Sequence, residues 1–330
     1  MATATYPGAG GITATTELGV FIPELWSDEI IGTYKSNLVA APLVVTMDHV
    51  GKKGDTVHIP TPTRESANAK AETTAVTIIA NTEGNKTFTI NQHFEYSRLI
   101  EDFAKVQAID TYRSFYTDDA GYALSKLVDT NILREGAGFG DSNFVQWSQA
   151  TNPEHWDTAY VGNDGTTLYD NATTGNASTL TDAAIRRSLQ RLDDDDVPSA
   201  RRVMIVPPVE KSNILGGIGT SNDLRTYSQY SSTGEAGSAN QIRSGLIADI
   251  YGVPVYVSTN APIVDDDNGD LDQRAVLIFQ KEALTLFEQQ RPRTQTQYKQ
   301  EYLADLFTAD IIFDTGVLRP EGGVALIVPE

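Results

Sequence analysis

Four histidines are the only imidazole side chains that could bind a metal or act as a base. They are His49, His58, His93 and His155. A catalytic zinc helix places two histidines four residues apart with a glutamate after the first, as in HExxH. No pair of these histidines has such a spacing. We therefore expect structural or surface roles for all four and predict no metal site.

Motifs for nucleophilic and phosphate chemistry are absent as well. The chain has no cysteine, which excludes thiol nucleophiles, disulfides and thiolate zinc sites. It has no GxSxG elbow, no GxxxxGK[ST] phosphate loop and no GxGxxG after a strand. Gly216, Gly217 and Gly219 precede Thr220 and Ser221 without a lysine, so we expect a flexible loop there. The sequence thus predicts neither an enzyme nor a cofactor.

The acidic segment 265–272, reading DDDNGDLD, could supply oxygen ligands to calcium. An EF-hand loop needs glycine at position 6 and oxygen ligands at positions 1 and 12. With Gly269 at position 6, Val264 falls at position 1 and Ala275 at position 12. We expect a solvated acidic turn, with weak divalent-cation binding as the alternative.

The overall charge argues against a protein that reads nucleic acid. The chain of 330 residues has 25 basic and 44 acidic residues, a net charge of −19, which opposes broad contact with phosphate backbones. Its 40% hydrophobic residues suffice for a sizeable core in about two domains. The N-terminus lacks the pattern of a signal peptide, and no apolar run is long enough to span a membrane.

Apolar residues at helical spacing predict three helices. One covers residues 23–39, with a proline at the first position. A longer one covers 109–134 and would extend about 40 Å. A third begins after Thr181, a good N-cap, and is ended by the aspartates at 193–196. Carboxylates at a helix C-terminus oppose the helix dipole, so we expect them to find a partner across an interface.

Strand patterns predict two hairpins in the first third of the chain and a strand-rich C-terminal third. The run 43–47 is expected to pair with Val57 and Ile59 across a turn at 51–54. The runs 76–79 and 86–90 are expected to form a second hairpin. A short helix to Leu215 is also expected. The remaining predicted strands are 203–206, 253–257, 275–279, the residues around Leu284 and Leu286, 311–313 and 324–328. Mixed α+β is the expected fold class.

The segment 61–91 is too polar to bury itself. Structureless loops longer than about 12 to 15 residues are uncommon inside compact domains. We therefore interpret this segment as an extended assembly arm that is ordered against a neighbouring subunit. Its five large apolar residues are Val76, Ile78, Ile79, Phe88 and Ile90.

The order of these parts resembles the major capsid (coat) proteins of tailed bacteriophages, whose shell fold is shared with encapsulins and the herpesvirus capsid floor. The resemblance extends nearly end to end. It depends on LGVFIPELWSDEIIGTYKSNLV, on GKKGDTVHIP before a long exposed hairpin, on a spine helix ending in VDTNIL, and on RRVMIVPP followed by IYGVPVYVS.

The resemblance implies a division of the chain into an arm, a loop and two domains. The implied parts are an N-terminal arm (1–22), a peripheral domain with the spine helix (23–60 and 92–138), an extended β-hairpin loop (61–91), an insertion or surface loop (139–180), an axial domain with a central mixed sheet (181–280) and strands returning to the peripheral domain (281–330).

The resemblance also implies a function and partners. Many copies would close as hexamers and pentamers into an icosahedral virion shell around double-stranded DNA, assembled in the host cytoplasm with a portal and with scaffolding or decoration proteins. No membrane would be involved. The implied subunit-interface residues are Lys70, Glu72, Val76, Ile78, Lys86 and Phe88.

Some members of the family join subunits through a lysine in the extended loop and an asparagine late in the chain. Lys70 and Lys86 lie in this loop, but no asparagine follows Asn268, so we expect no covalent cross-link. Two other hypotheses stay open. One is an encapsulin-like nanocompartment with the same fold, and the other is an unrelated two-domain enzyme that forms a small oligomer.

Overall fold

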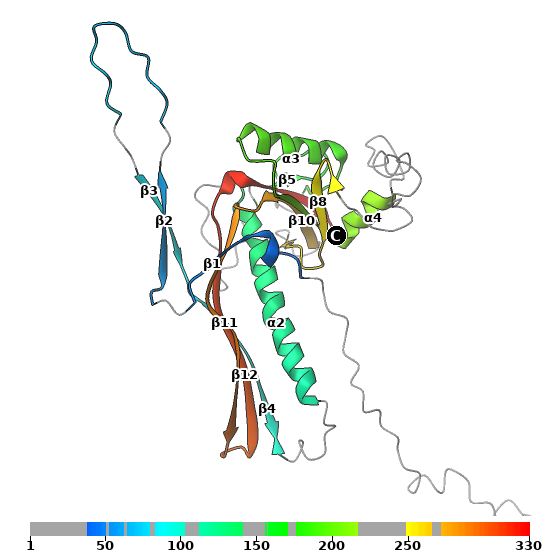
Figure 1. The fold of residues 1–330 in the computed structure, drawn as a ribbon. Coiled ribbons are helices and arrows are strands. Elements are labelled where there is room, and N and C mark those ends of the chain that lie inside the picture. The colour runs from blue at the N-terminus through cyan, green and yellow to red at the C-terminus, as the bar shows by residue number, and fades with distance from the viewer. Residues whose placement is uncertain are drawn as a thin grey trace, which may run out of the picture.

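The chain has a body built on two β-sheets, from which a two-stranded ribbon projects (Figure 1). One sheet of the body has four strands and the other has seven. The computed structural model describes residues 38–50, 53–62, 65–79, 83–102, 112–140, 156, 158–170, 176–216, 249–265 and 272–330. The predicted α+β class is confirmed.

The four-stranded sheet is dominated by one long hairpin, which a long helix accompanies along its length (Figure 1). The hairpin pairs Leu284 with Val317 at one end and Lys299 with Ala304 at the other. The first strand is parallel to its neighbour and the other pairs are antiparallel. The strands, in spatial order, are β1 (Val45–Asp48), β11 (Leu284–Lys299), β12 (Ala304–Val317) and β4 (Gln92–Glu101).

The predicted spine helix is confirmed as α2 (Tyr112–Arg134), which continues into the 3-10 turn η2 (Glu135–Gly138). Its 23 residues extend about 35 Å. Leu124 and Ile132 belong to the main hydrophobic core together with Phe313 of β12. A Cβ atom on Gly136 would lie 2.6 Å from Leu277 Cδ2, so glycine allows the end of the helix to approach the second sheet.

The seven-stranded sheet is buried on both faces, which explains the unbroken apolar runs in its central strands. Met204 and Ile278 face one hydrophobic cluster, whereas Ile205 and Leu277 face the other. The strands in order are β5 (Tyr160–Val161), β13 (Gly323–Pro329), β10 (Asp272–Gln280), β6 (Arg202–Val206), β8 (Val253–Val257) and β7 (Asp249–Ile250), with β9 (Ile263–Asp265) paired to β10.

Two parts of the expected domain division differ from this topology. β13 pairs with β10, with Ile327 opposite Ala275, so the segment 281–330 does not return entirely to the first domain. β5 pairs with β13, and Trp156 and Tyr169 are buried. The segment 139–180 is therefore partly core instead of a surface insertion, because its isolated aromatic residues close one edge of the second sheet.

Helix α3 (Asp182–Asp194) covers the second sheet, and its capping is as predicted (Figure 1). The Thr181 hydroxyl accepts a hydrogen bond from the N–H of Ala184 at 3.3 Å. At the other end, Asp193 lies 2.7 Å from Arg202 of the same chain, so the partner expected across an interface is found within the protomer. The predicted short helix is confirmed as α4 (Pro208–Gly216). No helix in the described residues is long and apolar enough to cross a membrane.

Both hairpins expected in the first third are wrong in their pairing. β1 pairs in parallel with β11 instead of with the residues around Val57. The ribbon consists of β2 (Thr56–Pro62) and β3 (Glu83–Thr89), and residues 76–79 form no strand. The alternation of apolar residues was a sound signal, because Val57 and Phe88 lie opposite each other. The partners of β1 and β4 are the strands β11 and β12, which lie about two hundred residues later in the sequence.

Several expectations fall outside the described residues. These are the N-terminal arm, the helix expected at 23–39 except for its last two residues, the loop after α4, His155 and residues 266–271. The ends of the acidic segment are described: Asp265 and Asp272 pair as neighbours in β9 and β10.

Candidate subunit interface

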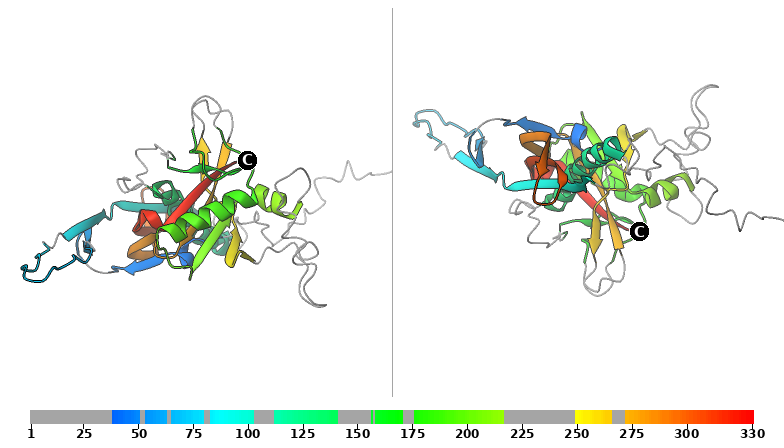
Figure 2. Two further views of the ribbon diagram at one scale, coloured as in Figure 1. Left: turned by 90° about the horizontal axis from the view of Figure 1, so that it is seen from above. Right: turned by 90° about the horizontal axis from the view of Figure 1, so that it is seen from below.

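The β2–β3 ribbon extends away from both sheets in all three views (Figures 1 and 2). Its register runs from Thr56 opposite Thr89 at the base to Pro62 opposite Glu83 at the outer end. Hydrogen bonds between His58 and the side chains of Asn85 and Thr87 connect the two strands on an exposed face. The outer end of the ribbon carries the loop 65–79, called the ribbon loop below.

The ribbon loop is exposed at every position from 65 to 79. The side chain of Val76 is 69% exposed and that of Ile78 is 89% exposed. Within the described part of the chain, its hydrogen bonds are local, from the N–H and the hydroxyl of Thr74 to the carbonyl of Ala71. A polar loop that displays large apolar side chains without covering them presents a contact surface.

The base of the ribbon is anchored to the four-stranded sheet by aromatic packing. Phe88 is 3% exposed, and its ring centroid lies 4.9 Å from that of Phe287. The Phe88 ring also lies over Gly316, where an added Cβ would come within 2.5 Å of its Cε1 atom. Ile90 is buried in the same cluster, and its N–H donates to the carbonyl of Asp55 at 2.7 Å. The ribbon is therefore held at its base and free at its outer end.

Lys86 lies beside this anchor instead of on a free surface. Its ammonium donates to the carbonyl of Leu318 at 3.4 Å and lies 5.9 Å from the centroid of the Phe88 ring. Burial lowers the pKa of Lys86, while the carboxylates of Glu321 and Glu135 act in the opposite direction. The side chain thus crosses from the ribbon to the end of β12.

The six residues expected at the interface separate into two groups. Lys70, Glu72, Val76 and Ile78 lie together in the exposed ribbon loop. Lys86 and Phe88 lie at the ribbon base, and the burial of Phe88 by its own chain contradicts an interface role for its side chain. The sequence did not show that the Phe88 side chain is covered within its own chain, because its partner, Phe287, lies in a strand almost two hundred positions later. Phe88 was therefore predicted to contact a neighbouring subunit.

A second exposed apolar group, which sequence reasoning missed, lies at the far end of the four-stranded sheet. Leu99, Tyr298, Tyr302 and Leu303 have exposed fractions between 45% and 64%. They come from β4, β11 and the β11–β12 turn. The sequence did contain a signal for this group. Tyr302 and Leu303 are large apolar residues that directly follow the polar run at the end of β11, where exposed side chains are expected.

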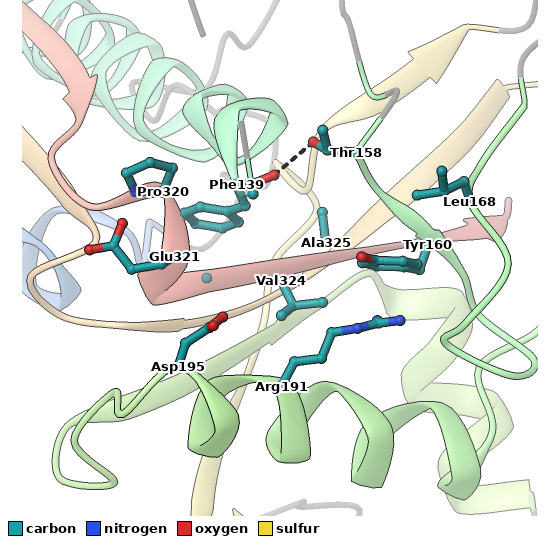
Figure 3. A pocket seen from close by; sticks show the side chains of 12 residues that line it. Phe139, Thr158, Tyr160, Leu168, Arg191, Asp195, Pro320, Glu321, Val324 and Ala325 are labelled. Carbon is teal, nitrogen blue, oxygen red and sulfur yellow. Dashed lines mark hydrogen bonds between the residues drawn. The ribbon is translucent and has the colours of Figure 1, made fainter. Parts of the chain in front are cut away.

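The cavity in Figure 3 has no arrangement suited to catalysis. Its volume is about 190 Å³, and α3, β5 and β13 contribute to its walls. The Arg191 guanidinium stacks on the Tyr160 ring at 3.4 Å from the centroid, and burial lowers the pKa of Arg191. No histidine lines the cavity, and Thr158 already donates its hydroxyl hydrogen to the carbonyl of Phe139. The cavity therefore offers no nucleophile hydrogen-bonded to a base.

The described histidines lie apart from one another, in separate hydrogen-bonding environments. His93 Nε2 lies 3.3 Å from Asp310, His58 bonds within the ribbon, and His49 bonds to the carbonyl of Met47. No group of three potential metal ligands occurs among the described residues.

Comparison with solved structures identifies the fold as the shell fold of tailed-bacteriophage capsid proteins. A chain from Mycobacterium phage Che8 matches with a TM-score of 0.68 and 23% identity, covering 93% of this chain and 97% of that one. A chain in the capsid of Cyanophage P-SCSP1u matches with a TM-score of 0.70 and 15% identity, covering 96% of each chain.

A chain from the capsid of the native GTA particle also matches, with a TM-score of 0.63 and 10% identity over 97% of this chain and 100% of that one. No protein-family model matches the sequence, and the search of curated proteins gives no match. The predicted shell fold is confirmed by these structures.

Proposed function

We propose that this chain is the major capsid protein of a tailed bacteriophage and that many copies close into an icosahedral shell around double-stranded DNA. The observation that carries the proposal is the ribbon loop, which is exposed throughout and displays Val76 and Ile78. The capsid shell fold along nearly the whole chain supports it. The protein acts through geometry and has no chemistry of its own.

The energetics of the ribbon loop favour a neighbour. Fixing the backbone costs about 1 kcal/mol per residue. All fifteen residues of the loop are exposed, so their own chain covers little apolar surface to offset that cost. A contact with another copy would bury the side chains of Val76 and Ile78 at roughly 1.5 to 3 kcal/mol each. Repeated around a ring and combined with lateral contacts, such interlocking reaches the roughly 2,000 to 5,000 Å² of obligate interfaces.

The same proposal specifies the partners. Hexamers and pentamers of this chain form the shell, a portal occupies one vertex, and scaffolding or decoration proteins assist assembly or cover the surface. The net charge of −19 keeps the shell from adhering to the DNA that it encloses. The location is the virion, after assembly in the host cytoplasm.

Electron microscopy and sedimentation velocity of the expressed full chain test the proposal. We expect closed shells, or rings of five and six copies that close when concentrated. A compact monomer or dimer at all concentrations contradicts the proposal and favours the two-domain enzyme. Encapsulin-like compartments share the fold, so the contents of particles purified from infected cells separate the two: phage DNA supports a capsid, and enclosed protein supports a compartment.

A paired substitution tests the ribbon loop directly. Val76→Ser with Ile78→Ser removes the exposed apolar contact and should leave a folded protein that does not form shells, because neither side chain contributes to the core. Leu168→Ser is the control, since Leu168 is 53% exposed on the body. Normal shells from the double variant contradict the proposed contact.

A further inference from the structure

A cationic cavity of about 290 Å³ lies where the first described residues meet the second sheet. Its walls come from η1 (Ala41–Leu43), from β6 and the turn before it, from β8 and the β7–β8 turn, and from the residue after β10. These four segments are distant in the sequence, so the cavity exists only in the folded protein. We call it the basic pocket.

Cations line the basic pocket, and no carboxylate does. The cations are Arg201, Arg202 and Lys281. Arg202 is paired with Asp193, and the Lys281 ammonium donates to the carbonyl of Pro42 at 3.2 Å. Neither Arg201 nor Lys281 forms an ion pair with any carboxylate in the described ranges. In a chain with a net charge of −19, such a pocket attracts an acidic group.

Two residues at the pocket have a backbone conformation that is uncommon for large side chains. Arg201 has a φ of 63° and Tyr251, in the β7–β8 turn, has a φ of 53°. Large side chains rarely adopt this left-handed conformation, which costs about 1 kcal/mol or more and persists where the surroundings enforce it. The Lys281 N–H donates to the carbonyl of Arg201 at 3.2 Å and so fixes the strained residue. The backbone of Arg201 is thus held at a defined position at the rim of the pocket.

Apolar residues complete the wall beside the cations. Leu43, Pro254 and Tyr256 line the pocket, and Tyr256 is 36% exposed. A ligand that fits this wall has a carboxylate with an apolar group close to it. A simple inorganic anion would leave the apolar part of the pocket uncovered.

The ribbon loop has the complementary features. Residues Ala71 to Thr74 form a turn closed by the Thr74 N–H, and Thr73 has a φ of 67°, an uncommon conformation for a β-branched residue. This turn displays Glu72 at its corner. Val76 follows four residues later, within about 13 Å even in a fully extended chain.

The loop cannot serve the pocket of its own chain in this arrangement. In all three views the ribbon points away from β8, which carries part of the pocket wall (Figures 1 and 2). A loop on one side and its receptor on the other define a head-to-tail contact, which closes into a ring when the rotation between copies is suitable.

We propose that the basic pocket of one copy receives the ribbon loop of a second copy, with Glu72 paired to Arg201 and Val76 placed on the apolar wall. This inference rests on the proposed shell function and names the receptor for its loop. Arg201 and Glu72 are both exposed, so exchanging their charges leaves the fold of the protomer intact.

Charge exchange tests the pairing. Glu72→Lys and Arg201→Glu should each reduce shell yield at least tenfold at low ionic strength, and the combined variant should recover most of the yield. Lys126→Glu, an exposed cation on α2, is the matched control for Arg201, and Glu65→Lys is the control for Glu72. Both controls should assemble normally, and thermal unfolding checks that all variants are folded.

Each failure has its own meaning. Normal assembly of Arg201→Glu overturns the pocket as receptor while leaving the shell function intact. Loss of assembly in both single variants without recovery in the combined variant overturns the Glu72–Arg201 pairing. If Arg201→Glu assembles but its particles retain less DNA, the pocket binds phosphate and the proposal is wrong. Absence of shells from the unaltered chain contradicts the proposed function itself.

Discussion

The side-chain amide of Asn260 donates a hydrogen bond of 2.9 Å to the carboxylate of Asp129, which lies 131 residues earlier. The other oxygen of that carboxylate accepts the N–H groups of Val39 at 2.9 Å and Ala40 at 2.6 Å. Both polar side chains are buried: Asp129 is 2% exposed and Asn260 is 7% exposed. One carboxylate of the spine helix therefore joins the start of the described chain to the residues after β8.

Replacing Asp129 should destabilise the protomer strongly. Asp129→Ala leaves three buried donors without an acceptor, and we expect the free energy of unfolding to fall by about 3 kcal/mol or more. Lys126→Ala, at an exposed position on the same helix, is the control. Urea denaturation of the unassembled Val76→Ser, Ile78→Ser protein measures both. Equal stability of the two variants would show that Asp129 does not act as a clamp.

The contact between Phe88 and Gly316 predicts a second effect on stability. A methyl group at Gly316 would overlap the Phe88 ring, so Gly316→Ala should displace the ribbon base and cost about 1 to 3 kcal/mol. Gly121→Ala is the matched control, because its methyl group would meet nothing within 4 Å and lies in an α-helix. That control should gain about 0.5 to 1 kcal/mol. Denaturation midpoints distinguish the two directions.

Local patterns in the sequence were sufficient for the elements whose signals are local. The helical spacing gave the extent of α2, and Thr181 marked the start of α3. The apolar runs of β6, β8, β10 and β13 were recognised because strands buried on both faces are almost continuously apolar.

Local sequence patterns did not predict which distant strands pair with each other. β1 lies beside β11, with Val45 opposite Thr285, and nothing near Val45 indicates a partner so far along the chain. For the same reason Phe88 was assigned to an interface, although Phe287 covers it. The ribbon loop itself was predicted correctly as an exposed segment, and the side chains of Val76 and Ile78 are 69% and 89% exposed.

Glu210 predicts an unusual dependence of stability on pH. Burial raises the pKa of this carboxyl to about 7, although hydrogen bonds from Asn213 and from the N–H of Leu180 favour the charged form. The unfolded chain loses this proton near pH 4.5, whereas the folded chain retains it up to about pH 7. The group therefore makes the folded protein less stable as the pH rises through that window, and its effect is constant above it.

Glu210→Gln removes this dependence, because an amide has no proton to lose in that range. Relative to the parent protein, the variant should become progressively more stable between pH 5 and pH 7, by up to roughly 3 kcal/mol. Urea denaturation at pH 5, 6, 7 and 8 measures the difference. Parallel curves for parent and variant would mean that Glu210 is already ionised at pH 5.

Asp310 predicts the opposite dependence at acid pH. Its carboxylate accepts hydrogen bonds from Arg293 at 2.8 and 3.0 Å and from Gln290 at 2.7 Å, next to the irregularity in the β11–β12 pairing. The bonds from Arg293 lower the pKa of Asp310 to about 2, with smaller contributions from Gln290 and His93. A depressed pKa contributes stability above the unfolded value of 3.8 that is lost as the pH falls towards 2.

Asp310→Asn should therefore destabilise the protein at pH 6 and much less at pH 2, where the folded parent carboxyl is about half protonated and most of its contribution is already lost. The acid-unfolding midpoint, followed by circular dichroism, should move to higher pH in the variant. Asp249→Asn, at an exposed position in β7, is the control and should leave the midpoint in place. A difference between parent and Asp310→Asn that persists unchanged at pH 2 would assign the effect of Asp310 to packing instead of to its charge.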